Sequence, residues 1–185
     1  MVKGFSLLKN DYSLFMNKSA SDISISAVYV DDIILTRDNV AVIQDLKAHL
    51  HNVFNIKDLG ELHFFLGIEV CHVSQGIILS QKKFTKELLQ ECLMDVYKQA
   101  QTALPAHIKL VNDAGDFYSD PTHYRCLVGK LDFLTHTRPY LSFAIQTLSQ
   151  FLQQPRLHHY HALQQVMRYI IDIVCQGGHL QALDS

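Results

Sequence analysis

Two adjacent acidic residues, Asp31 and Asp32, are the part of the sequence best suited to chemistry. They end the segment Tyr29-Val30-Asp31-Asp32, which lies between two short apolar runs. Neighbouring carboxylates repel each other, and a divalent cation relieves the repulsion. Mg²⁺ prefers one or two carboxylates, water and substrate phosphates, and pairs of such ions assist phosphoryl transfer. The acidic pair therefore predicts a metal-assisted reaction at a phosphate group.

The elements around the acidic pair predict a β-hairpin with the acids at its tip. Residues 23–30 alternate with period two and are mostly β-branched or aromatic, which is typical of a strand. Residues 33–36 form a second short apolar run. The alternative is a solvent-exposed acidic turn, because aspartate is common in turns. The apolar residues on both sides of the pair favour a buried strand over an exposed loop.

Further patterns in the N-terminal half predict a mixture of helices and strands. A capping pair, Asp38-Asn39, precedes apolar residues that recur at helical spacing. The elements expected in chain order are a helix at 40–54, a strand at 62–70, a tight turn at 74–76, a strand at 77–80 and a short helix at 84–92. The second pair of strands is a second hairpin.

The C-terminal part of the chain predicts helices only. Residues 101–118 lack a period and indicate a linker, after which Asp120 and Pro121 form a helix start. Three helices follow, with ends expected at Arg138-Pro139, Pro155 and Gly177-Gly178. The apolar face expected for the second helix consists of Phe143, Ala144, Thr147, Leu148 and Phe151. The fold class predicted is therefore α+β, with a strand-rich part followed by a three-helix region.

Composition excludes several classes of protein. The chain has 185 residues, of which 48% are hydrophobic and 18% charged, so we expect a real core. The formal net charge is −2, and the strongly basic footprint of an autonomous nucleic-acid binder is absent. The four cysteines form no CxxC pair, which favours reduced thiols in an intracellular protein. No apolar run suggests a signal peptide or a membrane span, so we expect neither secretion nor membrane insertion.

Three histidines, His158, His159 and His161, lie close together near the start of the last predicted helix. A metal site is one interpretation, since histidine is a common ligand. The other is a partly exposed polar face, because no carboxylate or cysteine accompanies the three residues.

The sequence resembles the copia-type reverse transcriptases of long-terminal-repeat retrotransposons. Tyr29-Val30-Asp31-Asp32-Ile33 is similar to their polymerase active-site turn. Other blocks keep the family order over almost the whole chain. They are Asn10-Asp11-Tyr12-Ser13-Leu14-Phe15, Lys57-Asp58-Leu59-Gly60-Glu61-Leu62, Phe65-Leu66-Gly67-Ile68-Glu69-Val70, Gly76-Ile77-Ile78-Leu79-Ser80-Gln81, Asp120-Pro121-Thr122-His123-Tyr124-Arg125, Leu127-Val128-Gly129-Lys130-Leu131, Thr137-Arg138-Pro139, Leu148-Ser149-Gln150-Phe151 and Arg168-Tyr169.

The resemblance implies a division of the chain and a set of site residues. Residues 1–100 would be a partial polymerase palm, 101–118 a linker and 119–185 a thumb and connection region. Asp31 and Asp32 would be catalytic carboxylates that bind Mg²⁺ or Mn²⁺. Nucleic-acid contacts would come from Tyr29, Lys82 and Lys83, the lysines following a hairpin similar to the one that grips the primer end. The implied partners are an RNA or DNA primer–template and deoxynucleotides.

Departures from the family limit what this chain is expected to do alone. The family's third metal-binding aspartate and its fingers would lie ahead of residue 1. The chain is therefore expected to be a reverse transcriptase fragment that holds Mg²⁺ weakly and does not polymerise by itself. The alternatives are a nucleic-acid-binding remnant and a protein-interaction remnant that self-associates through an open sheet edge. A cytoplasmic particle or the nucleus is the expected location.

Overall fold

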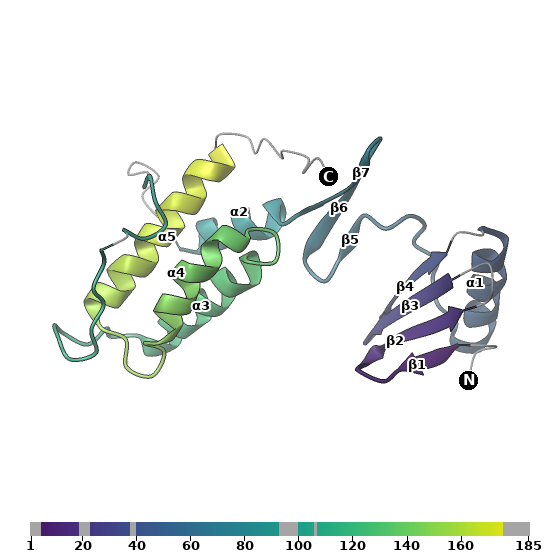
Figure 1. The fold of residues 1–185 in the computed structure, drawn as a ribbon, viewed down its shortest axis with the longest axis horizontal. Helices are drawn as coiled ribbons and strands as arrows, with labels where there is room; N and C mark the ends of the chain where they lie inside the picture. The colour runs from purple at the N-terminus through teal and green to yellow at the C-terminus, as the bar shows by residue number, and fades with distance from the viewer. Residues whose placement is uncertain (1–4, 19–22, 38–39, 93–99, 106, 176–185) are drawn as a thin grey trace. The chain divides into compact units, whose positions relative to one another are not determined.

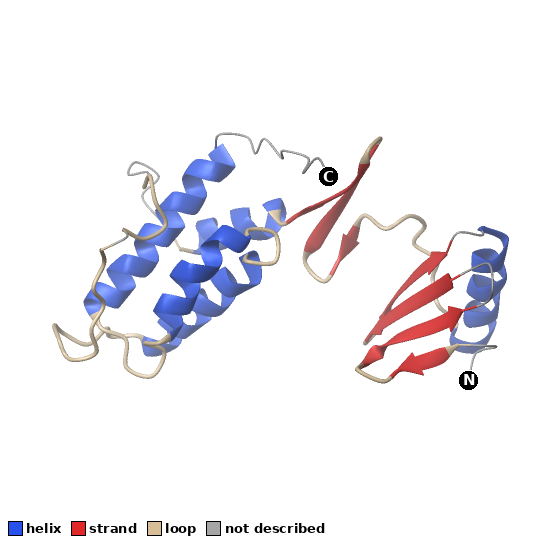
Figure 2. Ribbon diagram, viewed as in Figure 1, coloured by secondary structure: helices blue, strands red, loops and turns tan. Residues whose placement is uncertain are grey.

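The structure, a computed structural model, describes residues 5–18, 23–37, 40–92, 100–105 and 107–175. The chain forms two compact units, Met1–Leu62 and His63–Ser185, which we call unit 1 and unit 2. Figure 1 labels the elements of both units, and Figure 2 separates helices from strands. Both units combine antiparallel sheet with helix, which confirms the α+β class.

Unit 1 is a four-stranded antiparallel sheet in the order β1-β2-β3-β4 with one helix, α1 (Figure 1). The predicted hairpin is confirmed, because β3 and β4 pair along their whole length. The elements are β1 Ser6–Leu8, β2 Asp11–Lys18, β3 Ile23–Tyr29, β4 Asp32–Arg37 and α1 Val40–Phe54. The helix predicted at 40–54 is thereby confirmed, while its capping pair Asp38-Asn39 lies outside the described residues.

At the start of β3 in this sheet the polar side chains are buried and the apolar ones are exposed. Ser24 and Ser26 of β3 are buried, whereas Ile23 and Ile25 are 45% and 36% exposed. Ser24 lines a small pocket together with Leu35 of β4 and residues Ile43 and Leu46 of α1. Because side chains alternate along a strand, α1 covers the serine face and leaves the isoleucine face open.

Unit 2 contains a three-stranded antiparallel sheet, β5-β6-β7, followed by helices (Figure 1). Its elements are β5 Phe64–Phe65, β6 Ile68–Val73, β7 Gly76–Ser80, α2 Lys82–Glu91, α3 Pro121–Leu134, the 3₁₀ helix η1 Pro139–Leu141, α4 Ser142–Ser149 and α5 Leu157–Cys175. These confirm the short helix after the second hairpin and the three later helices. The stop expected at Gly177-Gly178 lies outside the described residues.

The single strand predicted at residues 62–70 is wrong, because the chain folds back in the middle of it. Leu66 and Gly67 have φ values of +48° and +82°, and they join β5 to β6 as a two-residue turn. Glycine adopts positive φ without steric cost, which makes Gly67 the residue that permits the turn. The second hairpin, β6–β7, has its turn at Ser74 and Gln75 as predicted.

The helix boundaries in unit 2 follow local sequence signals. The Asp120 carboxylate accepts a hydrogen bond of 2.8 Å from the His123 amide, and Pro121 occupies the first turn of α3. This cap is the one predicted. The apolar face predicted for α4 is wrong in one member, since Phe143 is 71% exposed. Ala144 is buried as predicted, and Ile145, which the prediction left out, is buried as well.

The hydrophobic core belongs to unit 2. In unit 1, Leu50 is the one buried apolar side chain among residues 5–18, 23–36 and 43–62, whose side chains the structure describes. In unit 2 the buried side chains form one cluster drawn from α2, α3, η1, α4 and α5: Leu88, Tyr124, Leu127, Val128, Leu131, Leu134, Leu141, Ala144, Ile145, Leu148, Ala162, Leu163, Val166, Met167 and Ile170. Unit 2 is therefore the better-packed part of the chain.

The segment 101–118, predicted to be a linker between domains, lies inside unit 2. Its described residues form no helix or strand, as predicted, but they are attached to the start of α5. Arg156 donates to the carbonyl of Gly115 at 2.5 Å and to that of Asn112, and its guanidinium lies over the Phe117 ring. Tyr118 stacks on Tyr160 with ring centroids 4.2 Å apart. These contacts explain why a segment without sequence periodicity is ordered.

The three histidines at the start of α5 have different environments. His159 is fully buried, His158 is half-buried and His161 is exposed. The Nε2 atoms of His158 and His159 both lie 3.1 Å from the Val111 carbonyl oxygen. In the part of the chain that the structure describes, no three His, Cys, Asp or Glu side chains are grouped so that they could hold a metal ion. The contacts of His158 and His159 with Val111 attach the start of α5 to the backbone of the segment 101–118.

Candidate functional site

The acidic pair lies at the tip of the β3–β4 hairpin. Tyr29 and Asp32 are the last paired residues, so Val30 and Asp31 form a two-residue loop. Directly paired residues of antiparallel strands point to the same face of a sheet. Tyr29 and Asp32 therefore share the open face of the sheet, the one that α1 does not cover.

The hairpin tip is exposed rather than buried, contrary to the expectation from its apolar flanks. Val30 is 82% exposed and Tyr29 53%, and both aspartates are exposed. The flanking apolar residues lie on an open sheet face, which the sequence pattern alone does not distinguish from a covered one. The carboxylates are consequently accessible to a cation and to a large ligand.

Val30 has a φ of +51°, in the left-handed region. A β-branched residue rarely adopts this conformation, because its Cβ substituents crowd the backbone. Such strain persists where the surrounding structure enforces it, and it concentrates at functional turns. Here the β3–β4 pairing on both sides of a two-residue loop enforces it.

Replacing Val30 with glycine should stabilise the hairpin. A left-handed backbone costs a non-glycine residue about 1–2 kcal/mol, and the greater unfolded-state entropy of glycine offsets about 0.5–1 kcal/mol of that gain. Because the Val30 side chain is exposed, little burial is lost. We expect slower amide exchange in β3 and β4 of Val30→Gly. Val28→Gly, at an ordinary strand position in β3, should accelerate it, and an equal effect of the two substitutions would contradict the strain at Val30.

The carboxylates fit a loosely held divalent cation. Two neighbouring carboxylates and water are donors that Mg²⁺ accepts. Among the described residues no further His, Cys, Asp or Glu side chain joins them to form a larger group. The donor set of this chain is thus the minimum for a metal site.

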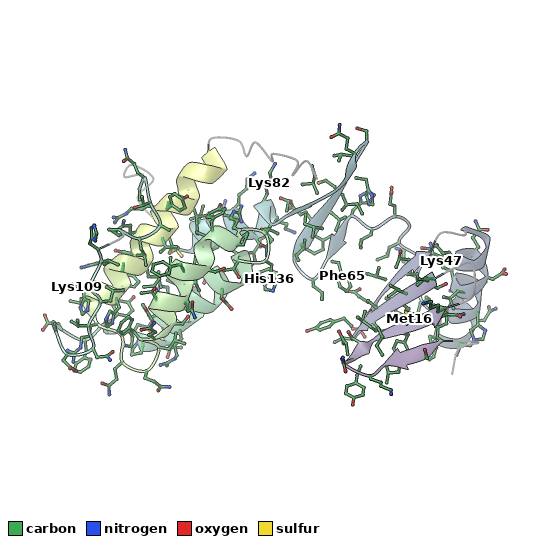
Figure 3. All side chains as sticks on the ribbon, in the orientation of Figure 1. Met16, Lys47, Phe65, Lys82, Lys109 and His136 are labelled. Carbon is green, nitrogen blue, oxygen red and sulfur yellow. The ribbon has the colours of Figure 1, made fainter. Side chains whose placement is uncertain are left out.

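Lys82 and Lys83 lie at the start of α2 in unit 2, directly after β7 (Figure 3 labels Lys82). Both side chains are exposed. Their backbone amides are engaged, since the Lys82 amide donates to Ser80 Oγ at 3.3 Å and the Lys83 amide to Glu69 Oε1 at 2.9 Å. The predicted site residues thus form two groups, one at the hairpin tip of unit 1 and one at the α2 start of unit 2.

Sequence reasoning missed the residues that hold the β5–β7 sheet to the helices. Gln81 is 1% exposed and donates from Nε2 to the Phe133 carbonyl at 3.0 Å. Its Oε1 accepts a 2.7 Å hydrogen bond from Thr137 Oγ1. A signal was present, because Gln81 and Thr137 both lie in blocks shared with the copia-type family, yet no local pattern pairs residues so far apart.

Comparison with known proteins identifies the family of the chain. The family described as reverse transcriptase (RNA-dependent DNA polymerase) matches residues 1–106. The retrovirus-related Pol polyprotein from transposon RE2 of Arabidopsis thaliana is 38% identical over 170 residues, which are 92% of this chain and 12% of the polyprotein. The corresponding polyprotein from transposon TNT 1-94 of Nicotiana tabacum is 30% identical over 89% of this chain and 13% of its own length.

A shorter relative covers a similar region. An uncharacterised mitochondrial protein of Arabidopsis thaliana is 36% identical over 154 residues, which are 83% of this chain and 63% of that protein. No solved structure matches the chain. This chain spans about an eighth of the polyproteins, 12% and 13% of their lengths. It therefore belongs to the reverse transcriptase family of RNA-dependent DNA polymerases, in the copia-type branch found in retrotransposon Pol polyproteins.

Proposed function

We propose that this chain supplies the carboxylate hairpin and the duplex-holding helices of an RNA-directed DNA polymerase. In this proposal residues 1–100 are part of the palm, 101–118 connect it, and 119–185 form the thumb and connection. The observation that carries it is the two-residue tip of β3–β4, which presents adjacent exposed carboxylates within the segment that matches reverse transcriptases. An exposed tip on an open sheet face suits a large ligand such as a duplex.

Asp31 and Asp32 would bind Mg²⁺ or Mn²⁺ at this tip. The bound ion would supply activation of the primer hydroxyl and stabilisation of the leaving oxygen. The chain's own contribution is to hold two carboxylates on a strained, short loop whose backbone has little freedom. Two carboxylates do not provide all the positioning that phosphoryl transfer needs, so the chain alone should bind a primer–template without extending it. Deoxynucleotides would be used only by the longer polymerase.

Lys82 and Lys83 would contact backbone phosphates of the primer–template, and Tyr29 would contact nucleic acid beside the carboxylates. The backbone amides of Lys82 and Lys83 donate to Ser80 and Glu69, which fixes the backbone positions from which the two lysine side chains extend. Lysine contacts to phosphate position a duplex without reading its sequence. We therefore expect binding that is salt-dependent and sequence-independent.

Binding of an RNA–DNA primer–template, measured by fluorescence anisotropy at several salt concentrations, tests this function. Each lost phosphate contact reduces the slope of log K against log salt by about 0.9, so the variant Lys82→Ala with Lys83→Ala should reduce the slope by about 2. The control, Lys57→Ala with Lys109→Ala, makes the same charge change at exposed positions elsewhere (Figure 3 labels Lys109). Its slope should equal that of the parent chain.

The same reactions, supplied with Mg²⁺ and deoxynucleotides, should show no primer extension. A parent chain without measurable affinity would contradict the binding function. Equal slopes for the two double variants would contradict the role of Lys82 and Lys83. Extension that disappears in Asp31→Asn would show that the chain is a complete polymerase.

A second candidate function is protein interaction, including self-association. The open face of the unit 1 sheet, with Ile23 and Ile25 exposed, favours it, and such faces recruit partners. Light scattering on the binding samples separates the two functions, because a monomer that binds duplex excludes self-association.

A cytoplasmic particle or the nucleus is the proposed location of the protein. The thiols of Cys71, Cys92 and Cys126 are free. Among the described helices, none is long and apolar enough to cross a membrane.

A further inference from the structure

Three segments of unit 2 that are far apart in sequence meet at Phe133, near the C-terminal end of α3. The β5–β6 turn contributes Gly67, the β7–α2 junction contributes Gln81, and the segment after α3 contributes Thr137. Each lies in a block that resembles the copia-type family, and the hairpin tip of unit 1 has no part in this contact. We call Gly67, Gln81, Phe133 and Thr137 the joint.

Gln81 caps the end of α3. The last four carbonyls of a helix lack partners within it and need donors from elsewhere. The Phe133 carbonyl accepts from Gln81 Nε2 at 3.0 Å and lies 2.9 Å from His136 Nδ1. Thr137 Oγ1 in turn donates to Gln81 Oε1. The nitrogen and the oxygen of the Gln81 side-chain amide are therefore both hydrogen-bonded, and the side chain is 1% exposed.

A side chain of β6 caps the start of α2. The Glu69 carboxylate of β6 accepts from the Lys83 amide at 2.9 Å, where a negative charge also suits the helix dipole. One turn later, Thr85 Oγ1 donates to the Gln81 carbonyl at 2.7 Å and accepts from Arg138 Nη1 at 3.2 Å. Thr85 is fully buried. Hydrogen bonds thus link β6 to the start of α2, and α2 to Arg138, the residue before η1.

Packing at Phe133 closes the joint. A Cβ added to Gly67 would lie 2.9 Å from Phe133 Cζ, which shows how closely the β5–β6 turn approaches this ring. The Phe133 ring also meets Phe84 of α2 edge-to-face, with centroids 4.9 Å apart. The ring thus holds the hairpin turn and α2 while the carbonyl of the same residue holds Gln81.

From these contacts we propose that Gln81 is a positioning residue that fixes the β5–β7 sheet to α2 and α3, so that this sheet and these helices hold a duplex as one rigid body. The duplex part rests on the proposed function, and the rigid body does not. The Gln81 amide is buried and hydrogen-bonds through both its nitrogen and its oxygen to the end of α3 and the segment after it, which defines one orientation, whereas an apolar residue of equal size would permit several.

Hydrogen exchange of the full chain, read by mass spectrometry, tests the rigid body. Gln81→Leu keeps the size of the side chain and removes both of its hydrogen bonds. We expect the amides of β6 and β7 to exchange roughly 10- to 100-fold faster, while those of α4 and α5 keep their parent rates. A residue that served stability alone would accelerate all of these amides together.

Two further variants sharpen the test. Thr137→Val removes only the donor to Gln81 Oε1, and we expect the same selective pattern at smaller amplitude. This variant also answers the question if Gln81→Leu does not fold. Gln90→Leu makes the same substitution at an exposed position of α2 and should change nothing. Unchanged β6–β7 rates in both joint variants, or acceleration spread equally over α4 and α5, would overturn the proposal.

A binding measurement separates this inference from the proposed function. If Gln81→Leu selectively accelerates exchange in β6 and β7 and weakens primer–template binding, the positioning role of Gln81 and the proposed duplex binding are both supported. If the hairpin loosens and the affinity is unchanged, Gln81 still positions the hairpin and the role of the hairpin in duplex binding is contradicted. If the hairpin does not loosen, the positioning role is overturned, whatever the affinity.

Discussion

Acidification from pH 7 to pH 4 should lower the free energy of unfolding of unit 2 by about 3 kcal/mol through His159 alone. His159 is fully buried, and its Nδ1 accepts a 3.0 Å hydrogen bond from the Arg156 amide. An accepting Nδ1 requires a neutral ring. Burial, the neighbouring His158 and the Arg156 guanidinium together lower the pKa of His159 to about 4.

The direction of this pH effect follows from the protonation of His159 in the folded and the unfolded chain. In the unfolded chain His159 has its ordinary pKa of about 6.5 and takes up a proton as the pH falls below that value. The folded chain keeps the ring neutral until about pH 4. Between these values the unfolded state binds more protons, so the stabilisation present above pH 6.5 is lost progressively toward pH 4. Below pH 4 this contribution stays constant.

Urea unfolding between pH 4 and pH 8, followed by circular dichroism at 222 nm, measures the effect. His159→Phe keeps a ring stacked on Phe151 and removes the titrating group, so its pH dependence should be flatter than that of the parent. His161→Phe, two residues along the same helix and exposed, should leave the parent's pH dependence in place. Equal curves for His159→Phe and the parent would show that His159 is not the titrating group.

Truncation of Tyr124 should produce the largest loss of stability. Tyr124 is fully buried in the core of unit 2, and its hydroxyl donates to the Leu148 carbonyl of α4 at 2.9 Å. Removing a buried aromatic side chain costs about 3–5 kcal/mol. We expect Tyr124→Ala to lower the free energy of unfolding by about 4 kcal/mol, a large fraction of the roughly 5–15 kcal/mol that is typical of a folded protein.

A second substitution separates packing from hydrogen bonding. Tyr124→Phe keeps the ring and removes the hydroxyl donor to the Leu148 carbonyl, which still accepts from the Phe151 amide at 3.1 Å, so it should cost about 1–2 kcal/mol. Tyr140→Phe removes a hydroxyl from an exposed tyrosine of η1 and should cost little. Urea midpoints give all three values. Equal losses for Tyr124→Phe and Tyr124→Ala would mean that the hydroxyl, not the ring, stabilises the core.

Local signals predicted most of the elements in this chain. The Asp120–Pro121 start of α3 needs only the residues of its own first turn, and the spacing of apolar residues over 40–54 is that of a helix. The β3–β4 hairpin likewise follows from alternation interrupted by two acids. The acidic pair at the tip was therefore placed correctly in the fold from the sequence alone.

Features that depend on distant partners could not be predicted in this way. Alternation in β3 shows two faces, but only the position of α1 decides that Ser24 and Ser26 are covered instead of Ile23 and Ile25. The segment 101–118 has no period, because its order comes from Arg156 and the histidines of α5. For the same reason the role of Gln81 emerges only when α3 is in place beside it.

The uneven distribution of the core has a consequence for how this protein would unfold. The carboxylate hairpin belongs to unit 1, where Leu50 is the one buried apolar residue among the side chains that the structure describes, whereas the helices of unit 2 share a large cluster. Heat or denaturant should therefore melt the sheet of unit 1 first and leave a half-folded chain whose helices remain intact. A helical signal would then report a folded protein after Asp31 and Asp32 had already lost their arrangement. The metal binding proposed for Asp31 and Asp32 would then be lost before the main thermal transition.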